Sequence, residues 1–169
     1  IACPFQLSKV VPGPGLISAR MGLQHTHSLQ QNFIMTQPTR SELLAFFNLH
    51  GVRDVECIFP DVSGYPRGKL MTTASFAAGN ELRIAQAIPM QCVTGDYSYD
   101  PIFPDSDPDV RLAPDYRTLK LAPWSSTPRA FAIHDCVELN GEPCAFSARS
   151  LLQTVVARYT AQGLTPVVA

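Results

Sequence analysis

Two short segments on either side of a glycine-containing turn constrain the fold of this chain more than any other feature. Val55, Cys57 and Phe59 alternate with neighbours that include two acidic residues, which is the period-2 pattern of a half-buried strand. Residues 61–64, Asp-Val-Ser-Gly, form a turn signal, and residues 67–71, Arg-Gly-Lys-Leu-Met, resume an extended pattern. We therefore predict a β-hairpin here.

Two helices are predicted, one before the hairpin and one near the end of the chain. Thr39 and Glu42 have the spacing of a capping box, a run of Leu and Phe follows, and Gly51 supplies a stop. Ser147 can cap a second helix, whose apolar residues form one face and which Gly163 ends. Both helices are expected to pack through one apolar face.

Further strands complete the fold class. Residues 117–121 and 130–137 are interpreted as strands, and Asn140-Gly141 is a strong turn signal after the second of them. A short helix over residues 74–81 is weakened by Gly79. Strands mixed with two or three helices, and no internal repeat, predict an α+β domain built on a mixed sheet.

The segment from Gly95 to Asp115 is interpreted as the longest candidate functional loop. It holds six Asp and four Pro, with Arg111 as the only basic residue. A calcium loop is rejected because Val110 replaces the required Gly and Tyr116 replaces the bidentate Glu. The carboxylates could still attract a metal ion, an ammonium ion or a diamine, and a solvated acidic loop is the alternative. They are Asp96, Asp100, Asp105, Asp107 and Asp109.

Composition excludes several classes of protein. The 169 residues, 46% of them apolar, suffice for one core, and 13 Lys plus Arg against 14 Asp plus Glu create no field that would recruit nucleic acid or an anionic membrane. No apolar run reaches the roughly 18 residues of a membrane span. Five widely spaced Cys make a poor disulfide framework or zinc site, so a reduced, cytoplasmic protein is expected.

Residues 1–34 differ from the rest because they contain Lys9 and Arg20 but no acidic residue. The Pro-Gly-Pro-Gly sequence at residues 12–15 is typical of a loop. We interpret this stretch as a disordered or non-native extension ahead of a start at Met35, with an organelle transit peptide as the alternative.

Two motifs invite functional interpretations that the sequence does not support. The stretch from Ser63 to Lys69 resembles a phosphate-binding loop, but Gly is required at position 63 and Ser or Thr at position 70. A tight hairpin with Arg67 and Lys69 facing solvent is favoured instead. Trp124 follows a proline between two strands and is interpreted as a packing residue.

From Val55 onward, the order of short motifs resembles the glutamine synthetase superfamily. No single motif is specific, but their order and spacing over about the last 115 residues are. The motifs are Asp61-Val-Ser-Gly-Tyr-Pro-Arg-Gly-Lys69, Ala113-Pro-Asp115, Thr118-Leu119, Pro123-Trp124, Asp135, Asn140-Gly-Glu-Pro143 and Ala148-Arg149-Ser-Leu151.

The resemblance implies a β-grasp-like amino-terminal domain over residues 35–163. Residues 164–169 would then be the start of a catalytic domain, before which the chain is truncated. In that family ATP phosphorylates the γ-carboxylate of glutamate, and ammonia or an amine attacks the γ-glutamyl phosphate to form an amide. The resemblance places ATP and Mg or Mn in the missing domain, so this fragment alone is expected to bind neither and to be inactive.

The resemblance also implies a homo-oligomeric ring in which this domain lends aspartates to the amine-binding end of a neighbouring subunit's site. By position Asp96 is the best match and Asp109 the second. A carboxylate there can hold an ammonium cation and take a proton as the amine becomes a nucleophile. These two residues are the predicted catalytic residues.

The acceptor is predicted from a departure from the family pattern. Members that use ammonia show a Phe-Asp-Gly-Ser-Ser-like segment, whereas this chain has Thr94-Gly-Asp-Tyr-Ser-Tyr-Asp100. The chain is more similar to the γ-glutamyl-polyamine branch, so an organic amine like putrescine is expected. A glutamine synthetase that uses ammonia is the alternative, and a non-catalytic β-grasp binding module is the second alternative.

Overall fold

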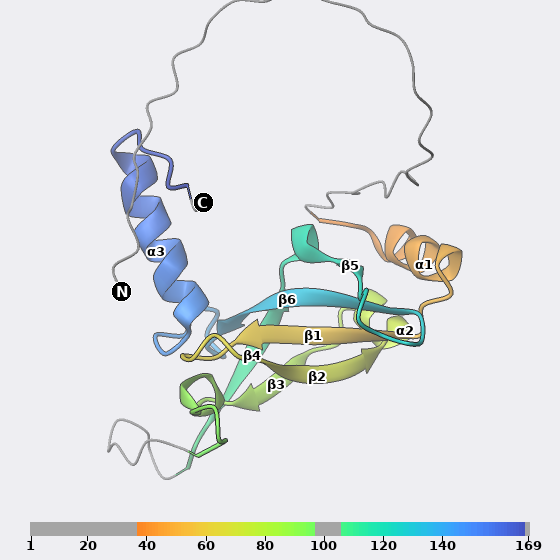
Figure 1. Cartoon of the computed structure of the whole chain (residues 1–169), viewed down its shortest axis with the longest axis horizontal. Coiled ribbons are helices and arrows are strands. Elements are labelled where there is room, and N and C mark those ends of the chain that lie inside the picture. Colours follow the sequence, from red (N-terminus) through yellow and green to blue (C-terminus); the bar gives the residue numbers. More distant parts are fainter. Residues whose placement is uncertain (1–36, 97–105, 168–169) are drawn as a thin grey trace, which may run out of the picture.

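The computed structural model describes residues 37–96 and 106–167, and it confirms an α+β fold (Figure 1). The strands form one mixed sheet in the order β2-β1-β6-β4-β3, with β5 paired to β6. Only β1 and β6 run parallel among the strand pairs of the described residues, and the other pairs are antiparallel. The elements, in chain order, are α1 (Arg40–Leu49), β1 (Asp54–Pro60), β2 (Pro66–Thr72), α2 (Thr73–Ala77), β3 (Leu82–Ala85), the 3-10 helix η1 (Ile88–Met90), β4 (Asp109–Pro114), the 3-10 helix η2 (Tyr116–Thr118), β5 (Lys120–Leu121), β6 (Arg129–Val137) and α3 (Ala148–Ala161).

The two central strands bury one face of the sheet. On β1 and β6 every second residue is buried, and the parallel register sets Val55 opposite Ala130 and Cys57 opposite Ala132. Small residues on β6 leave room for the helices α1 and α2, which bring Phe47 and Phe76 respectively against this face. The first core cluster consists of Leu43, Phe47, Val52, Val55, Cys57, Phe76, Ala77, Leu119, Ala130 and Ala132.

A second apolar cluster continues the same face toward β3 and β4. Its buried members are Phe59, Ile84, Val110, Leu112, Cys136 and Cys144. Val110 and Leu112 lie in β4, within the segment predicted to be loop, so that prediction is wrong for Asp109–Pro114. The count of Asp and Pro hid a short alternation in which Val110 and Leu112 point into the core while Asp109 and Arg111 do not.

The strand predicted over residues 117–121 is also partly wrong. Tyr116–Thr118 forms η2, and only Lys120–Leu121 pairs with β6 as β5. The hydroxyl of Thr118 bridges the interruption: it accepts a hydrogen bond from Ile133 N at 2.7 Å and donates one to Asp115 O at 2.7 Å. The strand pairing beside β6 is therefore interrupted at this point, but the backbone amide of Ile133 still has a hydrogen-bond partner.

The hairpin and the helix ends follow the sequence predictions. β1 and β2 pair antiparallel across the predicted turn. The capping box at Thr39 is formed, because Thr39 N donates to Glu42 Oε2 at 2.7 Å and Glu42 N donates to Thr39 Oγ1 at 3.3 Å. The weak helix near residue 74 is only five residues long, and Gly79 with φ +70° follows it.

The last helix, α3, extends away from the sheet (Figure 1). It touches β6 and β1, and Ser150 in its first turn is its one buried residue. Four of the five apolar side chains predicted to form a packing face are exposed in this structure, and the fifth, Tyr159, is half-buried. Their exposed fractions are 65% for Leu151, 61% for Leu152, 39% for Val155 and 36% for Val156.

The predicted extension over residues 1–34 lies outside the described residues. The domain boundary at residue 163 stays a prediction. Within residues 37–96 and 106–167, no helix combines the length and the apolar character that crossing a membrane requires.

Candidate functional site

The turn between β1 and β2 is organised by one buried carboxylate. Asp61 is 1% exposed, and its side chain accepts hydrogen bonds from Ser63 N at 2.9 Å, Tyr65 N at 2.8 Å and Arg67 Nε at 2.7 Å. Burial by itself raises the pKa of Asp61, but the hydrogen bond from Arg67 and those from the two amides outweigh it, and the pKa is lowered. Asp61 is thus a charged residue that shapes the turn.

Arg67 connects this turn to the loop that carries the first predicted catalytic residue. Its Nη2 donates to the carbonyl of Cys92 at 2.6 Å, while Val62 N donates to Pro89 O at 2.8 Å. The prediction that Arg67 faces solvent is therefore wrong: its side chain is only 21% exposed, and its guanidinium group donates both to Asp61 and to the carbonyl of Cys92. Lys69 is exposed, but its ammonium donates to the carbonyl of Arg83 at 2.8 Å and so links the two outer strands.

The loop after η1 places Asp96 at the surface. Gly95 N donates to Cys92 O at 2.9 Å and Cys92 N donates to Asp96 O at 3.0 Å, which closes a tight turn. Gln91 Nε2 donates to Gly95 O at 2.8 Å, and Thr94 Oγ1 donates to Asp96 Oδ2 at 2.7 Å. The Asp96 side chain is exposed, and the hydroxyl of Thr94 orients its carboxylate.

The second predicted residue, Asp109, is the exposed first residue of β4 and lies opposite Ala85 of β3. Asp107 instead supports the local backbone, because its Oδ1 accepts a hydrogen bond from Ala87 N at 3.0 Å, at the start of η1. Asp96 and Asp109 flank residues 97–105, which lie outside the described residues together with Asp100 and Asp105. The amine-binding roles of Asp96 and Asp109 stay a prediction.

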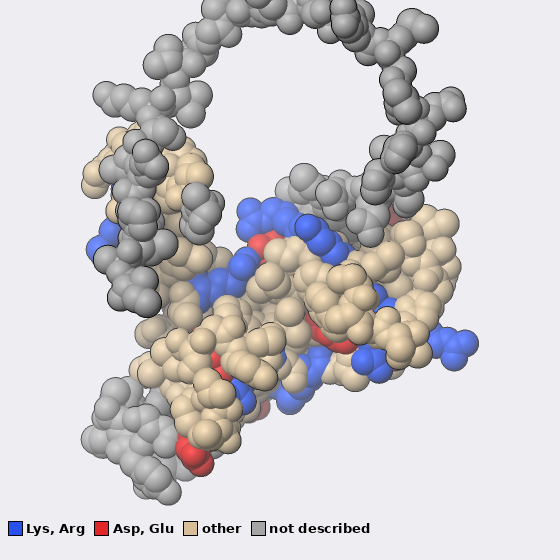
Figure 2. All heavy atoms as spheres, viewed as in Figure 1, with Lys and Arg blue, Asp and Glu red and all other residues tan. Residues whose placement is uncertain are grey.

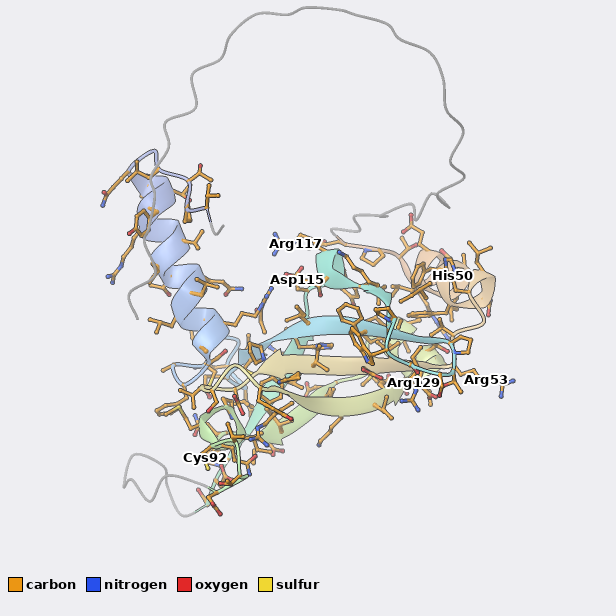
Figure 3. All side chains as sticks on the ribbon, in the orientation of Figure 1. His50, Arg53, Cys92, Asp115, Arg117 and Arg129 are labelled. Atoms are coloured by element: carbon orange, nitrogen blue, oxygen red, sulfur yellow. The ribbon has the colours of Figure 1, made fainter. Side chains whose placement is uncertain are left out.

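A separate charged cluster joins η2 and β6 to α3. Arg117 Nε donates to Asp115 Oδ1 at 2.8 Å, and Arg149 of α3 donates to both Asp115 and Asp135. Gln153 Nε2 adds a hydrogen bond to Asp135 Oδ1 at 3.0 Å. Figure 2 shows basic and acidic side chains side by side in this region, and Figure 3 shows Asp115 and Arg117 on the opposite side of the sheet from Cys92.

This cluster borders an open hollow of about 540 Å³, lined by Gln37, Pro114, Asp115, Tyr116, Arg117 and Asp135. The hydrogen bond from Arg117 is the main cause that lowers the pKa of Asp115, against burial, which raises it. The two guanidinium groups and two carboxylates neutralise one another, so the cluster is suited to hold α3 against the sheet. Sequence reasoning used Asp115, Asp135 and Arg149 only as parts of a resemblance, and their proximity had no signal in the sequence.

Trp124 packs in part, as predicted. Its ring lies 4.9 Å from that of Phe131 between centroids, and its Nε1 donates to Glu56 Oε2 at 3.0 Å, yet the residue is 60% exposed. Across the described part of the chain, no group of three or more His, Cys, Asp and Glu side chains is arranged to hold a metal ion.

Comparison with known proteins shows a shared fold. No family model and no curated protein matches the chain. Among the solved structures it resembles are GmaS in complex with ADP (TM-score 0.56, 22% identity over 76% of this chain), a glutamine synthase homolog (0.58, 23% over 66%) and GmaS without ligand (0.56, 21% over 72%). The chain spans about a quarter of each, 26%, 27% and 27% of their lengths.

Proposed function

We propose that this chain is the amino-terminal, β-grasp-like domain of an ATP-dependent ligase of the glutamine synthetase superfamily. The observation that carries the proposal is the fold shared with GmaS and a glutamine synthase homolog over 66–76% of the chain. The order of motifs from Asp61 to Leu151 supports the same assignment independently of the fold. Because this chain spans only about a quarter of those structures, most of the catalytic machinery would lie outside it.

The exposed face of α3 supports a larger protein. An isolated helix of about 12–15 residues is marginal in water, and most helical stability comes from packing an amphipathic face. Beyond its first turn this face of α3 is largely exposed within the described residues, and Leu151 and Leu152 are more than half exposed. We propose that a catalytic domain following α3 in the same polypeptide covers this face. A free-standing binding module, the second alternative, would leave it in water.

In the proposed reaction the whole enzyme joins glutamate to an amine through γ-glutamyl phosphate. Asp96, with Asp109 as the second residue, would bind the amine as a cation and accept its proton, at the site of a neighbouring subunit in a ring. Both carboxylates are exposed, as a residue that completes a partner's site requires. ATP and Mg or Mn would be bound by the catalytic domain, as the resemblance to the glutamine synthetase superfamily implies.

The amine is proposed to be organic and similar to putrescine. The support is the segment Thr94-Gly-Asp96, which replaces the pattern of ammonia-using members and in which Thr94 fixes the carboxylate of Asp96. A glutamine synthetase that uses ammonia remains the alternative. The proposal and this alternative differ in which nucleophile, an organic amine or ammonia, stimulates ADP formation more.

The test is an ADP-release assay on the full-length protein with glutamate, ATP and Mg²⁺ or Mn²⁺, comparing putrescine with ammonia at equal concentration. We expect glutamate-dependent ADP release that putrescine stimulates more than ammonia does, and none from the 169-residue chain alone. Absence of glutamate-dependent release in the full-length protein would refute the proposed family.

The role of Asp96 is tested in the same assay. Asp96→Asn is expected to raise KM for the amine at least about tenfold, equivalent to about 1.4 kcal/mol, with little change in KM for ATP or glutamate. Glu81→Gln, an exposed carboxylate on another part of the surface, is the matched control and should have no effect. Equal losses for all three substrates would contradict a role in amine binding.

A further inference from the structure

Two cysteines that are eight positions apart in the sequence are brought face to face by the turn that follows β6. Val137 forms an antiparallel bridge with Pro143, framed by hydrogen bonds from Cys144 N to Cys136 O at 3.0 Å and from Glu138 N to Glu142 O at 2.7 Å. In this register Cys136 and Cys144 are directly opposite each other.

The two side chains also point to the same place. Both cysteines are 0% exposed and belong to the second core cluster, where Val110 and Leu112 surround them. Residues directly opposite at a hydrogen-bonded position of an antiparallel pair have Cα atoms about 5.5 Å apart. Disulfides span Cα separations of about 4.4–6.8 Å, a range that includes this spacing. They also need Cβ atoms about 3.5–4.5 Å apart, so the two strands must move slightly closer together for the bond to form.

We propose that Cys136 and Cys144 form a reversible modification site, a cross-strand disulfide made by exchange with a small-molecule disulfide. This inference goes beyond the proposed function and does not depend on it. The four cysteines of the described residues are free thiols in this structure. Sequence spacing had predicted no disulfide, because the Asn140-Gly141 turn signal did not by itself set the register that places the two cysteines opposite each other.

The exchange proceeds in two steps. The thiolate of Cys144 attacks one sulfur of the oxidant, which forms a mixed disulfide and releases one thiol. The thiolate of Cys136 then attacks the sulfur of Cys144 and releases the second thiol. The two cysteines lose two protons and two electrons in total, and the oxidant is reduced to two thiols.

Burial controls the rate of this reaction. It raises the pKa of Cys136 to about 12 and also raises that of Cys144, so few thiolates exist at neutral pH. The turn between the two strands carries exposed residues at Asn140 and Gly141, and its local opening would give the oxidant access to Cys144. We expect slow exchange that accelerates as the pH rises from about 7 to about 9.

The bond would also reinforce the start of α3. The carbonyl of Cys144 accepts a hydrogen bond from Ser147 N at 3.2 Å, and Ser147 is the N-cap of α3. Linking Cys144 to β6 therefore restrains the segment that leads into the helix. Amide exchange in the first turn of α3 should be slower in the oxidised form than in the reduced form.

The experiment uses the 169-residue chain with Cys3→Ser and Cys92→Ser, because the exposed Cys92 thiol, whose hydrogen bond with Thr94 lowers its pKa, would react first. The native protein is equilibrated with oxidised and reduced glutathione at about pH 8.5, where more of each thiol is ionised, then alkylated and analysed by intact mass and peptide mapping. We expect the loss of two hydrogen atoms, a peptide linking Cys136 to Cys144, and full reversal by a dithiol reductant.

Matched variants distinguish this site from adventitious oxidation. Cys57→Ser removes the other buried thiol of the described residues and should change nothing, whereas Cys136→Ser should leave only a glutathione adduct or no product. The mapping of the parent protein does not depend on whether Cys136→Ser folds. Two unlinked cysteines at every redox ratio, a link to Cys57, or a link that forms only in denaturant would each overturn the proposal.

Discussion

Replacing the buried carboxylate of the first hairpin tests the physical account of this fold most directly. Asp61 is held by two backbone amides and by Arg67, with oxygen-to-nitrogen distances of 2.7–2.9 Å. Asp61→Asn preserves an oxygen that can accept both amide hydrogen bonds but removes the charge that faces the guanidinium. Asp61→Ala removes the carboxylate entirely, so two backbone amides and the Arg67 guanidinium lose their hydrogen-bond acceptor.

The magnitudes follow from these contacts. Hydrogen bonds to charged groups contribute about 1.5–3 kcal/mol, and removing one partner of a buried ion pair costs about 3–5 kcal/mol. Since the Arg67 side chain is 21% exposed, water can solvate it in part, which favours the lower end of each range. We expect a loss of unfolding free energy of about 2 kcal/mol for Asp61→Asn and about 3 kcal/mol for Asp61→Ala.

Urea unfolding at neutral pH, followed by far-UV circular dichroism and by the fluorescence of the single Trp, measures both losses. With a urea dependence of about 1–3 kcal/mol per molar, Asp61→Asn should lower the midpoint by roughly 1 M. The control is Glu81→Gln, which removes a carboxylate paired with Arg83 at the surface and should change stability by less than about 0.5 kcal/mol. Equal losses for the Asp61 and Glu81 variants would refute the reasoning.

The pH dependence provides a second measurement on the same variants. The pKa of Asp61 is lower in the folded protein than in the unfolded chain, where it is about 3.9. The stabilisation is therefore fully present above the unfolded value and is lost as the pH falls through the folded value. The difference between the parent protein and Asp61→Asn should shrink below about pH 4.

Three further predictions concern the sheet and α3. Gly68→Ala should lower the free energy of unfolding in urea by about 2–3 kcal/mol, because a Cβ there would lie 1.9 Å from a backbone carbonyl oxygen of β1. Gly64→Ala is the control: its Cβ would meet open space, so only the strain of φ +78° remains and the cost should be about 1 kcal/mol. Equal costs for the two variants would contradict the clash. Burial lowers the pKa of His134, so the free energy of unfolding should fall as the pH drops below about 6.5. In His134→Gln the free energy of unfolding should depend less on pH between about pH 7 and 5. An unchanged pH dependence would exclude His134 as its cause. Arg149→Met should speed amide exchange in α3 about tenfold, or about 1.4 kcal/mol, without affecting β6; equal acceleration in both would indicate a global effect.

The motifs that carry the family resemblance turn out to be structural. Asp61 and Arg67 build a turn and attach it to the loop of Asp96, while Gly68 permits close approach of two strands. Thr118 accepts the hydrogen bond of Ile133 N where strand pairing beside β6 is interrupted, and Arg149 connects α3 to Asp115. These residues explain why motif order indicated the fold correctly, and why it gives no direct view of the chemistry.

Elements that depend on near neighbours could be predicted from the sequence alone. The capping box at Thr39, the first hairpin and the Ser147 cap arise from contacts within a few residues, so spacing and side-chain type determine them. β6 was predicted from its own alternation of buried and half-buried residues, although its partners lie far away in the sequence. The prediction missed β4 because a two-residue apolar alternation around Val110 was outweighed by the surrounding Asp and Pro. It also missed β3, which is only four residues long.

What only the tertiary structure decided are the contacts between residues far apart in the chain. The parallel pairing of β1 with β6, the bond from Arg67 to the Cys92 carbonyl and the cluster that joins Arg149 to Asp115 link positions separated by 25 residues or more. Periodicity shows which face of a strand is buried but not which strand lies beside it, because many pairings bury the same face. The sequence alone determined the local elements and the fold class, whereas the folded chain decided which side chains meet.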